Sequence, residues 1–312
     1  MDKTLSLVVP VYFEEAVISR FILEVAEALN EIDIVYEIVF IDDGSTDNTV
    51  GLIKKEAKKN TAIKLIELSY NHGKQAALTA GITYAKGDYL LYMDPDLQDP
   101  PKEIIRFITE IEKGYDLVFG VRKEKKDTFI NSIFSKIFWS VLRRFTGLKI
   151  PKGLAVMRIF NRKFANKFLE YKEQNRFIEG IFMHIGMKQT SIKIEQRERF
   201  AGTSKFNFKR KMNLAFDAIF DFSELPLKFA VKLGSFLIFI GVLLLLVLIF
   251  LKLYLINFQS GWPSLIGALI VATGLQLFFI GIAALYIGKI YKESKSRPLF
   301  SVLELTNIDT KE

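Results

Sequence analysis

Two long apolar runs without a charged residue constrain this chain more than any other feature of its sequence. LGSFLIFIGVLLLLVLIFL covers residues 233–251, and PSLIGALIVATGLQLFFIGIAALYIG covers residues 263–288. A helix of about 20 apolar residues crosses a hydrocarbon core of roughly 30 Å. Because only a short turn separates the runs, we expect two transmembrane helices, at 233–253 and 263–288, paired as a hairpin.

Basic residues flank this hairpin on one side only. Lys228 and Lys232 precede the first run and four basic residues follow the second, whereas the turn at 254–262 has none. Cytoplasmic segments next to membrane spans carry the excess of lysine and arginine. The pattern predicts three regions: a cytoplasmic domain at 1–228, the hairpin at 229–290 and a cytoplasmic tail at 291–312, with both termini in the cytoplasm.

The first 120 residues have a different pattern. Short apolar runs at 5–12, 36–42, 63–68, 88–94 and 116–121 alternate with segments of helical period, such as 15–30, 47–59 and 101–113. Strand and helix repeated in this way predict an α/β domain with a parallel sheet covered on both faces. Ligands of such open sheets bind beyond the carboxyl ends of the strands, so we expect a site there.

Acidic residues follow several of these predicted strands. In YMDPDLQDP, residues 92–100, Asp94 and Asp96 are separated by a single residue. Two carboxylates so close at a buried strand end repel each other unless a cation lies between them. We therefore predict that Asp94 and Asp96 hold Mg²⁺ or Mn²⁺, with Gln98 as a neutral oxygen ligand. A solvated turn is the alternative for any isolated pair of this spacing.

The stretch IDDGSTD places Asp42 and Asp43 at the end of another predicted strand. Gly44 permits a tight turn, and the residues after it can cap the next helix, which is a purely structural interpretation. In the functional interpretation, the carboxylates accept hydrogen bonds from a base or a ribose.

Two amphipathic segments lie between the α/β region and the apolar runs. Residues 129–145 carry an apolar stripe with helical spacing, and residues 206–222 combine basic residues with phenylalanines. Both patterns are typical of helices in a membrane interface, although a core-facing helix has the same stripe. The net charge of +8 favours an anionic partner such as phosphate or lipid headgroups. Since the basic residues cluster beside the apolar runs, we expect no nucleic-acid partner.

The motifs VVPVYFEE, IDDGSTDNT, NHGKQAAL, DPDLQDPP and RERFAGTSKF occur in this order. Together with the paired apolar runs they resemble the polyprenyl-phosphate glycosyltransferases, a branch of the family 2 (GT-A fold) glycosyltransferases. The resemblance implies a GT-A (Rossmann-like), mostly parallel sheet and metal-dependent, inverting transfer. A nucleotide-sugar donor, by family a UDP-sugar, would give one sugar to undecaprenyl phosphate. It also implies a homotetramer in the bacterial inner membrane that contacts membrane lipids and serves the cell envelope.

The resemblance also assigns roles to residues. The nucleotide-sugar site would comprise Pro10, Tyr12, Glu14, Asp42, Asp43, Lys74, Gln75 and Asp94. The metal ligands would be Asp94, Asp96 and Gln98, and the lipid-phosphate site would comprise Arg122, Arg158, Arg199, Ser204 and Lys205. Asp96, Arg122 and Arg158 would be the catalytic residues. His72 and His184 are isolated from each other and are expected to be structural.

One segment departs from the family pattern. Many bacterial relatives have Gly-Asp-Phe-Arg-Leu where this chain reads GLAVMRIFNRK, so Val156 stands in place of an acid proposed as a base. A phosphate monoester is already ionised near neutral pH and needs little deprotonation to attack. Two rivals remain: a processive polysaccharide synthase and a non-catalytic membrane scaffold. Neither Trp139 nor Trp262 lies in the Gln-x-x-Arg-Trp motif typical of the former.

Overall fold

The computed structural model describes residues 3–122, 153–197, 225–254 and 261–309. The chain divides into two units. One unit holds all the described strands and the shorter helices, and it includes the C-terminal residues from Arg297 onward. The other unit holds the two longest helices.

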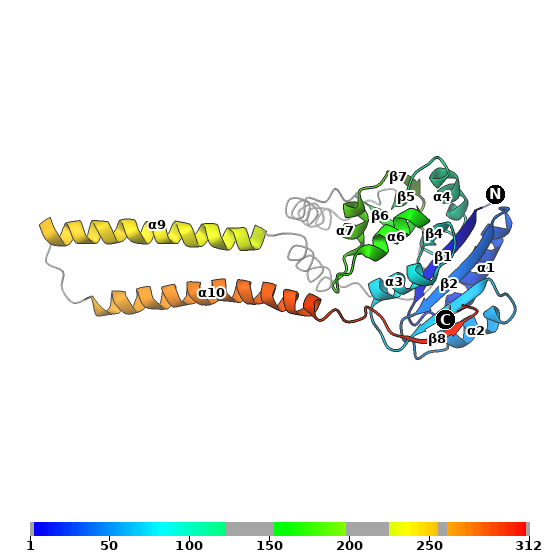
Figure 1. Ribbon diagram of the computed structural model, residues 1–312, viewed down its shortest axis with the longest axis horizontal. Coiled ribbons are helices and arrows are strands. Elements are labelled where there is room, and N and C mark those ends of the chain that lie inside the picture. Colours follow the sequence, from blue (N-terminus) through cyan, green and yellow to red (C-terminus); the bar gives the residue numbers. More distant parts are fainter. Residues whose placement is uncertain (1–2, 123–152, 198–224, 255–260, 310–312) are drawn as a thin grey trace. The chain divides into compact units, whose positions relative to one another are not determined.

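An eight-stranded sheet forms the first unit (Figure 1). Its strands are β1 (Thr4–Val11), β2 (Val35–Asp42), β3 (Ile63–Leu68), β4 (Tyr89–Tyr92), β5 (Leu117–Arg122), β6 (Leu154–Asn161), β7 (Gln189–Ile194) and β8 (Val302–Thr306). Their order across the sheet is β7-β5-β6-β4-β1-β2-β3-β8. Four of the seven neighbouring pairs are parallel, and the three pairs made by β6 and β8 are antiparallel. The prediction of a parallel sheet is thus confirmed for β1 to β4, whereas the whole sheet is mixed.

Helices cover both faces of this sheet, as the sequence predicts. They are α1 (Ile18–Asn30), α2 (Thr49–Ala57), α3 (Lys74–Tyr84), α4 (Glu103–Ile111), α6 (Arg162–Glu170) and α7 (Ile178–Ile185). The odd-numbered residues of β1, such as Leu7, belong to a core that includes Phe21 of α1 and Phe107 of α4. Val8 points to the other face, where it lies against Gly81 of α3. This alternation follows from the two-residue period of a strand.

The second unit consists of α9 (Leu225–Tyr254) and α10 (Trp262–Ser294). Within the described residues, one helical segment is long and apolar enough to cross a membrane: Ala268–Ser294, with a window of mean hydropathy 2.3. The second predicted span overlaps this segment. The first falls in α9, and its crossing of a membrane stays a prediction, as does the hairpin. The predicted interfacial helices, 129–145 and 206–222, lie outside the described residues.

The residues predicted as a tail return to the first unit. Strand β8 lies at the edge of the sheet and pairs with β3, with Leu65 opposite Thr306 and Leu68 opposite Val302. The side-chain amide of Asn307, just beyond β8, donates to the carbonyls of Ala57 and Ile63, both at 2.9 Å. The sequence pattern did not predict a strand in this region.

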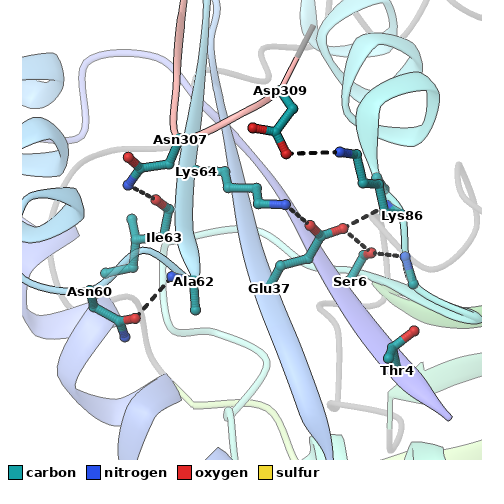
Figure 2. A network of polar contacts seen from close by, with 12 residues as sticks. Thr4, Ser6, Glu37, Asn60, Ala62, Ile63, Lys64, Lys86, Asn307 and Asp309 are labelled. Atoms are coloured by element: carbon teal, nitrogen blue, oxygen red, sulfur yellow. Dashed lines mark hydrogen bonds and ion pairs between the residues drawn. The ribbon is translucent and has the colours of Figure 1, made fainter. Parts of the chain in front are cut away.

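A polar network crosses the sheet near the start of its strands (Figure 2). Glu37 of β2 accepts hydrogen bonds from Ser6 Oγ at 2.5 Å and from the Lys86 N–H at 2.6 Å, and it pairs with Lys64 of β3. Its side chain is buried, yet every bond that the carboxylate needs comes from the protein.

Candidate active site

The candidate site lies where β1 and β4 separate. The chain passes from β1 outward to β2 and β3, and then returns to β4 on the other side of β1. The point at which the strand order reverses in this way is where open α/β sheets bind ligands. The expected position of the site, at the carboxyl ends of the strands, thus coincides with the switch point.

Pro10 marks this separation on β1. Met93 N–H donates to Val8 O at 3.3 Å, and Asp43 N–H donates to Val11 O at 3.0 Å. The backbone N–H and C=O groups of the even-numbered residues of β1 therefore point toward β4, and those of the odd-numbered residues point toward β2. Pro10 therefore turns its nitrogen, which has no hydrogen, toward β4, two residues beyond the end of the β1–β4 ladder. A proline is tolerated in this central strand because no partner remains on that side.

Asp94 and Asp96 follow β4 directly. Asp94 Oδ2 accepts a hydrogen bond from Lys74 Nζ at 2.6 Å, whereas Asp94 Oδ1 is buried and has no partner among the described residues. Asp96 Oδ1 accepts from the N–H of Gln98 at 3.1 Å. No three His, Asp or Glu side chains of the described segments cluster as metal ligands. The unpartnered oxygen of Asp94 and the neighbouring carboxylate fit a divalent cation that takes its other ligands from water and substrate.

Two cations flank the ring of Tyr92, the last residue of β4. Lys74 Nζ lies 5.7 Å from the ring centroid, and Arg158 Cζ lies 5.5 Å from it. Lys74 opens α3 and comes from the β3 side of the sheet, whereas Arg158 pairs with Tyr92 in the β4–β6 ladder. Tyr92 therefore contacts both Lys74, predicted for the nucleotide-sugar site, and Arg158, predicted for the lipid phosphate, although the sequence itself gave no reason to single out Tyr92.

Arg158 is a charged side chain inside the protein, with only 2% of its surface exposed. Its guanidinium donates to the carbonyls of Val156 and Ala155, lies 5.2 Å from the Phe182 ring centroid and reaches Glu179 at 3.5 Å. Within the described part of the chain, Nη1 is buried without a hydrogen-bond partner. An unpaired donor of this kind on a buried cation fits an anionic ligand.

Asp99 is a further buried carboxylate of this region, and the sequence analysis gave it no role. Asp99 Oδ2 accepts from the Met157 N–H at 3.2 Å and so ties the segment after β4 to β6. Asp99 Oδ1 lies 3.8 Å from Arg122 Nη2, beyond hydrogen-bonding distance. Burial raises the pKa of Asp99 above the usual aspartate range, against the lowering effect of Arg122. Its place in the quoted motif DPDLQDPP was the only available signal.

Gln98 has a contact that the sequence does not show. Its side-chain oxygen accepts a hydrogen bond from Gln196 Nε2 at 2.9 Å, and its carbonyl accepts from the Arg197 N–H, also at 2.9 Å. Gln98 therefore holds the segment after β7 against the metal motif. Its predicted metal ligation stays a prediction. Arg199, Ser204 and Lys205, predicted for the lipid phosphate, lie outside the described residues.

Asp42 and Asp43 have different surroundings although they are neighbours. Asp42 Oδ2 accepts from the N–H groups of Gly44 and Ser45, at 3.1 and 2.9 Å, whereas Oδ1 is buried without a partner in the described segments. Asp43 instead accepts from the N–H groups of His72 and Gly73, at 2.7 and 2.9 Å. Burial raises the pKa of both carboxyls. Asp42 thus has an oxygen to offer a ligand, while Asp43 secures the loop before α3.

Gly44 provides the tight turn that the sequence predicts. Its φ is +79°, and a Cβ there would lie 2.8 Å from the nitrogen of Asn71. Only glycine combines this backbone angle with so close an approach. The turn after β2 and the loop after β3 are thereby held together at the edge of the site.

The loop after β1 is tied to the loop after β2. Phe13 N–H donates to Ser45 Oγ at 3.0 Å, and Glu14 N–H donates to Thr49 Oγ1 at 2.9 Å. Tyr12 and Phe13 lie ring to ring, with centroids 4.3 Å apart. Gln75 lies beside Lys74 in the first turn of α3. The predicted nucleotide-sugar residues come from four segments that lie at or follow the carboxyl ends of β1 to β4: Pro10, Tyr12, Glu14, Asp42, Asp43, Lys74, Gln75 and Asp94.

Comparison with known proteins agrees with this architecture. The profile of "Glycosyl transferase family 2" matches residues 6–169. The uncharacterized glycosyltransferase YkcC of Bacillus subtilis (strain 168) is 35% identical over 307 residues, which are 98% of this chain and 95% of that protein. The uncharacterized glycosyltransferase sll0501 of Synechocystis sp. (strain ATCC 27184 / PCC 6803 / Kazusa) is 35% identical over 99% of this chain and 98% of its own.

Solved structures resemble the fold more distantly. The crystal structure of mannosyl-3-phosphoglycerate synthase from Rubrobacter xylanophilus aligns with 70% of this chain and 72% of its own, at 15% identity and a TM-score of 0.49. Nothing about substrate or metal follows from a similarity of this size. The match of the family profile and the two full-length relatives decide the identity: the chain belongs to glycosyl transferase family 2.

Proposed function

We propose that this protein is a membrane-bound, inverting glycosyltransferase that moves one sugar from a UDP-sugar to a polyprenyl phosphate at the cytoplasmic face of a bacterial inner membrane. Membership of family 2 supports sugar transfer. The observation that carries the proposal is the pair Asp94 and Asp96 at the switch point, with an unpartnered carboxylate oxygen beside Lys74.

On the donor side, the proposed nucleotide pocket lies between the loops after β1 and β2. Asp42 Oδ1 would accept a hydrogen bond from the base or ribose, and Tyr12 would pack against the base. Lys74 and Gln75 at the start of α3 would bind the diphosphate, because a helix N-terminus favours negative charge. Asp94 and Asp96 would hold a divalent cation, with Gln98 as a third oxygen. Bound there, Mg²⁺ or Mn²⁺ supplies Lewis-acid stabilisation of the leaving diphosphate.

On the acceptor side, we assign Arg122 and Arg158 to the phosphate of the lipid. The planar guanidinium pairs with phosphate oxygens in two directions, and Arg158 Nη1 is free to do so among the described residues. Arg199, Ser204 and Lys205 complete the proposed set. The lipid phosphate is ionised near neutral pH, so Val156 in place of an acid does not prevent attack. Catalysis would depend on positioning and on charge neutralisation.

The apolar helices support a lipid acceptor. Segment Ala268–Ser294 of α10 is long enough to cross a membrane, and the uncharged run 233–251 of α9 has the composition of a second span. A chain anchored in this way encounters a long-chain lipid phosphate by diffusion within the membrane. An enzyme with a soluble acceptor would not need such an anchor. The tetramer implied by the family resemblance belongs to the same proposal.

The direct test incubates the purified full chain with undecaprenyl phosphate, Mg²⁺ or Mn²⁺ and a panel of sugar nucleotides. Mass spectrometry should detect a lipid monophosphate that carries one sugar. A polymer would indicate a processive synthase instead, and absence of any glycolipid with every donor would contradict the proposal.

The variant Asp96→Asn isolates the metal motif. We expect transfer to fall at least a hundredfold, roughly the size of losing one electrostatic contact to the transition state. Mn²⁺-dependent nucleotide binding, measured by calorimetry, should weaken in parallel. Asp33→Asn is the matched control, because Asp33 is an exposed aspartate between α1 and β2, away from the switch point. Full activity of Asp96→Asn, or of the wild type in excess chelator, would contradict the metal role.

A further inference from the structure

The residues after α10 form a strap along one edge of the sheet. We define the C-terminal strap as Arg297–Asp309, which includes β8. Its first residue accepts a hydrogen bond at Arg297 O from Gln174 Nε2 at 2.6 Å. At its far end, Asn307 holds the carbonyls of Ala57 and Ile63, and Asp309 approaches Lys86 at 3.5 Å (Figure 2). The strap is therefore attached at one end to Gln174, between α6 and α7, and at the other end beside the start of strand β3.

Between these ends, Ser301 contacts the loop that leads into α3. Ser69 N–H donates to Ser301 O at 2.9 Å, and Ser301 N–H donates to Nε2 of His72 at 3.3 Å. The His72 ring also stacks on Tyr70, with centroids 3.8 Å apart. A neutral imidazole that accepts at Nε2 carries its proton on Nδ1. The ring of His72 thus connects the strap to the loop through a backbone donor.

The backbone of the same histidine is held from the opposite side. Asp43 accepts from the N–H groups of His72 and Gly73, as described above. Gly73, with φ +91°, directly precedes α3, and Lys74 is the first residue of that helix. Lys74 Nζ then meets Asp94 at 2.6 Å. Only Gly73 separates His72, whose ring contacts the strap, from Lys74, which contacts Asp94.

We propose that His72 is a positioning residue: its ring fixes the loop before α3 to the C-terminal strap and so sets the place of Lys74 beside Asp94. The inference rests on the proposed function for its effect on transfer, because Lys74 is there assigned to the donor diphosphate. Displacing a binding group by about 1 Å is enough to lower a rate substantially. Asp43 holds the backbone of the loop, and the His72 ring adds a second contact to the strap, with Nε2 3.3 Å from the Ser301 nitrogen and 3.5 Å from Ser69 Oγ.

Two substitutions separate the ring from its acceptor atom. His72→Phe keeps the stacking on Tyr70 and removes the acceptor, whereas His72→Gln keeps an acceptor near the position of Nε2 and removes the ring. With the full chain in detergent, we expect His72→Phe to raise the KM for the sugar nucleotide about tenfold and to change kcat less than about twofold. This is the result expected when a contact that binds the ground state and the transition state equally is lost. His72→Gln should restore most of the KM.

Hydrogen exchange tests the contact independently of activity. The amides of His72 and Gly73 should exchange about tenfold faster in His72→Phe than in the wild type, the size expected for one lost hydrogen bond. The matched control is His184→Phe at the second histidine of the chain, which contacts Tyr171 Oη at 2.7 Å in another part of the unit. This control should leave both the exchange of the loop and the KM unchanged.

Each outcome decides the inference. Unchanged exchange and unchanged KM in His72→Phe would overturn it, as would a loss of kcat alone. If His72→Phe does not fold, Ser301→Pro removes the donor from the strap side and is expected to give the same rise in KM and in exchange. If the wild type transfers no sugar, the proposed function fails, whereas the exchange experiment still decides whether His72 fixes the loop.

Discussion

The two ends of strand β2 carry buried carboxylates with opposite surroundings. Glu37, near its start, accepts from Ser6, from the Lys86 N–H and from Lys64. Burial by itself would raise the pKa of Glu37, but the bonds from Lys64, Lys86 and Ser6 outweigh burial, and its pKa is lowered. Asp42, at the other end, keeps one buried oxygen unpartnered in the described structure, and burial raises its pKa.

Within one strand, this difference separates a carboxylate whose hydrogen bonds are complete from one that keeps an oxygen available for a ligand. A buried carboxylate with all its hydrogen bonds stabilises the fold, whereas one with a vacant oxygen costs stability unless a ligand completes it. Groups whose pKa is shifted by burial cluster at functional sites, and Asp42, Asp43 and Asp99 all lie at the carboxyl ends of the strands. Glu37 lies at the opposite end of the sheet.

The largest effect is expected from Glu37→Ala. Removal of this carboxylate leaves the half-buried ammonium of Lys64 without its partner, so we expect a loss of about 3 kcal/mol in the free energy of unfolding. The corresponding fall in the thermal midpoint is roughly 6–12 °C for a domain of this size. Replacing both residues, as Glu37→Met with Lys64→Met, should recover much of the loss. An unchanged thermal midpoint in Glu37→Ala would contradict the inference that the Glu37 carboxylate stabilises the fold.

Asp42→Asn should act in the opposite direction on stability. The amide keeps an oxygen for the N–H groups of Gly44 and Ser45 but carries no charge into the protein. We expect the free energy of unfolding to rise by about 1 kcal/mol and nucleotide affinity to fall about tenfold or more. Calorimetry with UDP and thermal unfolding measure the two quantities. A destabilised variant with normal affinity would show that Asp42 is structural, like Glu37.

The same contrast explains what the sequence could predict. The strands β1 to β5 were found because each is a short apolar run, and Asp94 and Asp96 because only one residue separates them after such a run. Strand β6 was missed since it contains the charged Arg158, which becomes buried only through Tyr92 and Phe182. Strand β8 was missed because it pairs with residues more than 230 positions earlier and has exposed side chains.

Side-chain contacts between distant segments also could not be predicted from the sequence. Nothing in the motif DPDLQDPP indicates that Gln98 binds Gln196 or that Asp99 binds the backbone of Met157. Likewise, the sequence does not distinguish the neighbouring acids Asp42 and Asp43. Only the fold shows that Asp43 accepts hydrogen bonds from the loop before α3. Residue types and their order predicted a candidate site beyond the carboxyl ends of the strands, whereas the contacts of each residue within it depend on partners that only the fold brings together.

A pH series sharpens the comparison between the two ends of β2. A raised carboxyl pKa means that the folded state loses stability as pH rises through that pKa, so the advantage of Asp42→Asn over the wild type should shrink as pH falls toward the unfolded aspartate value of about 3.8. The lowered pKa of Glu37 gives stability that is lost only as pH falls below its unfolded value of about 4.5. The difference between Glu37→Gln and the wild type should therefore stay constant from neutral pH down to about pH 4.5. Thermal midpoints at several pH values measure both, and parallel curves for the two variants would contradict the assignment.

The smallest expected effect concerns the far end of the strap, near Glu37. Asn307 has a φ of +57°, so Asn307→Gly removes the amide that binds Ala57 O and Ile63 O while keeping this backbone accessible. Because both hydrogen bonds of Asn307 are only partly buried, we expect a loss of only about 1 kcal/mol. Asp309→Asn is the control: its carboxylate is 96% exposed and its ion pair with Lys86 should contribute almost nothing. Equal losses in the two variants would show that charge, and not the amide's two hydrogen bonds, holds the end of the strap.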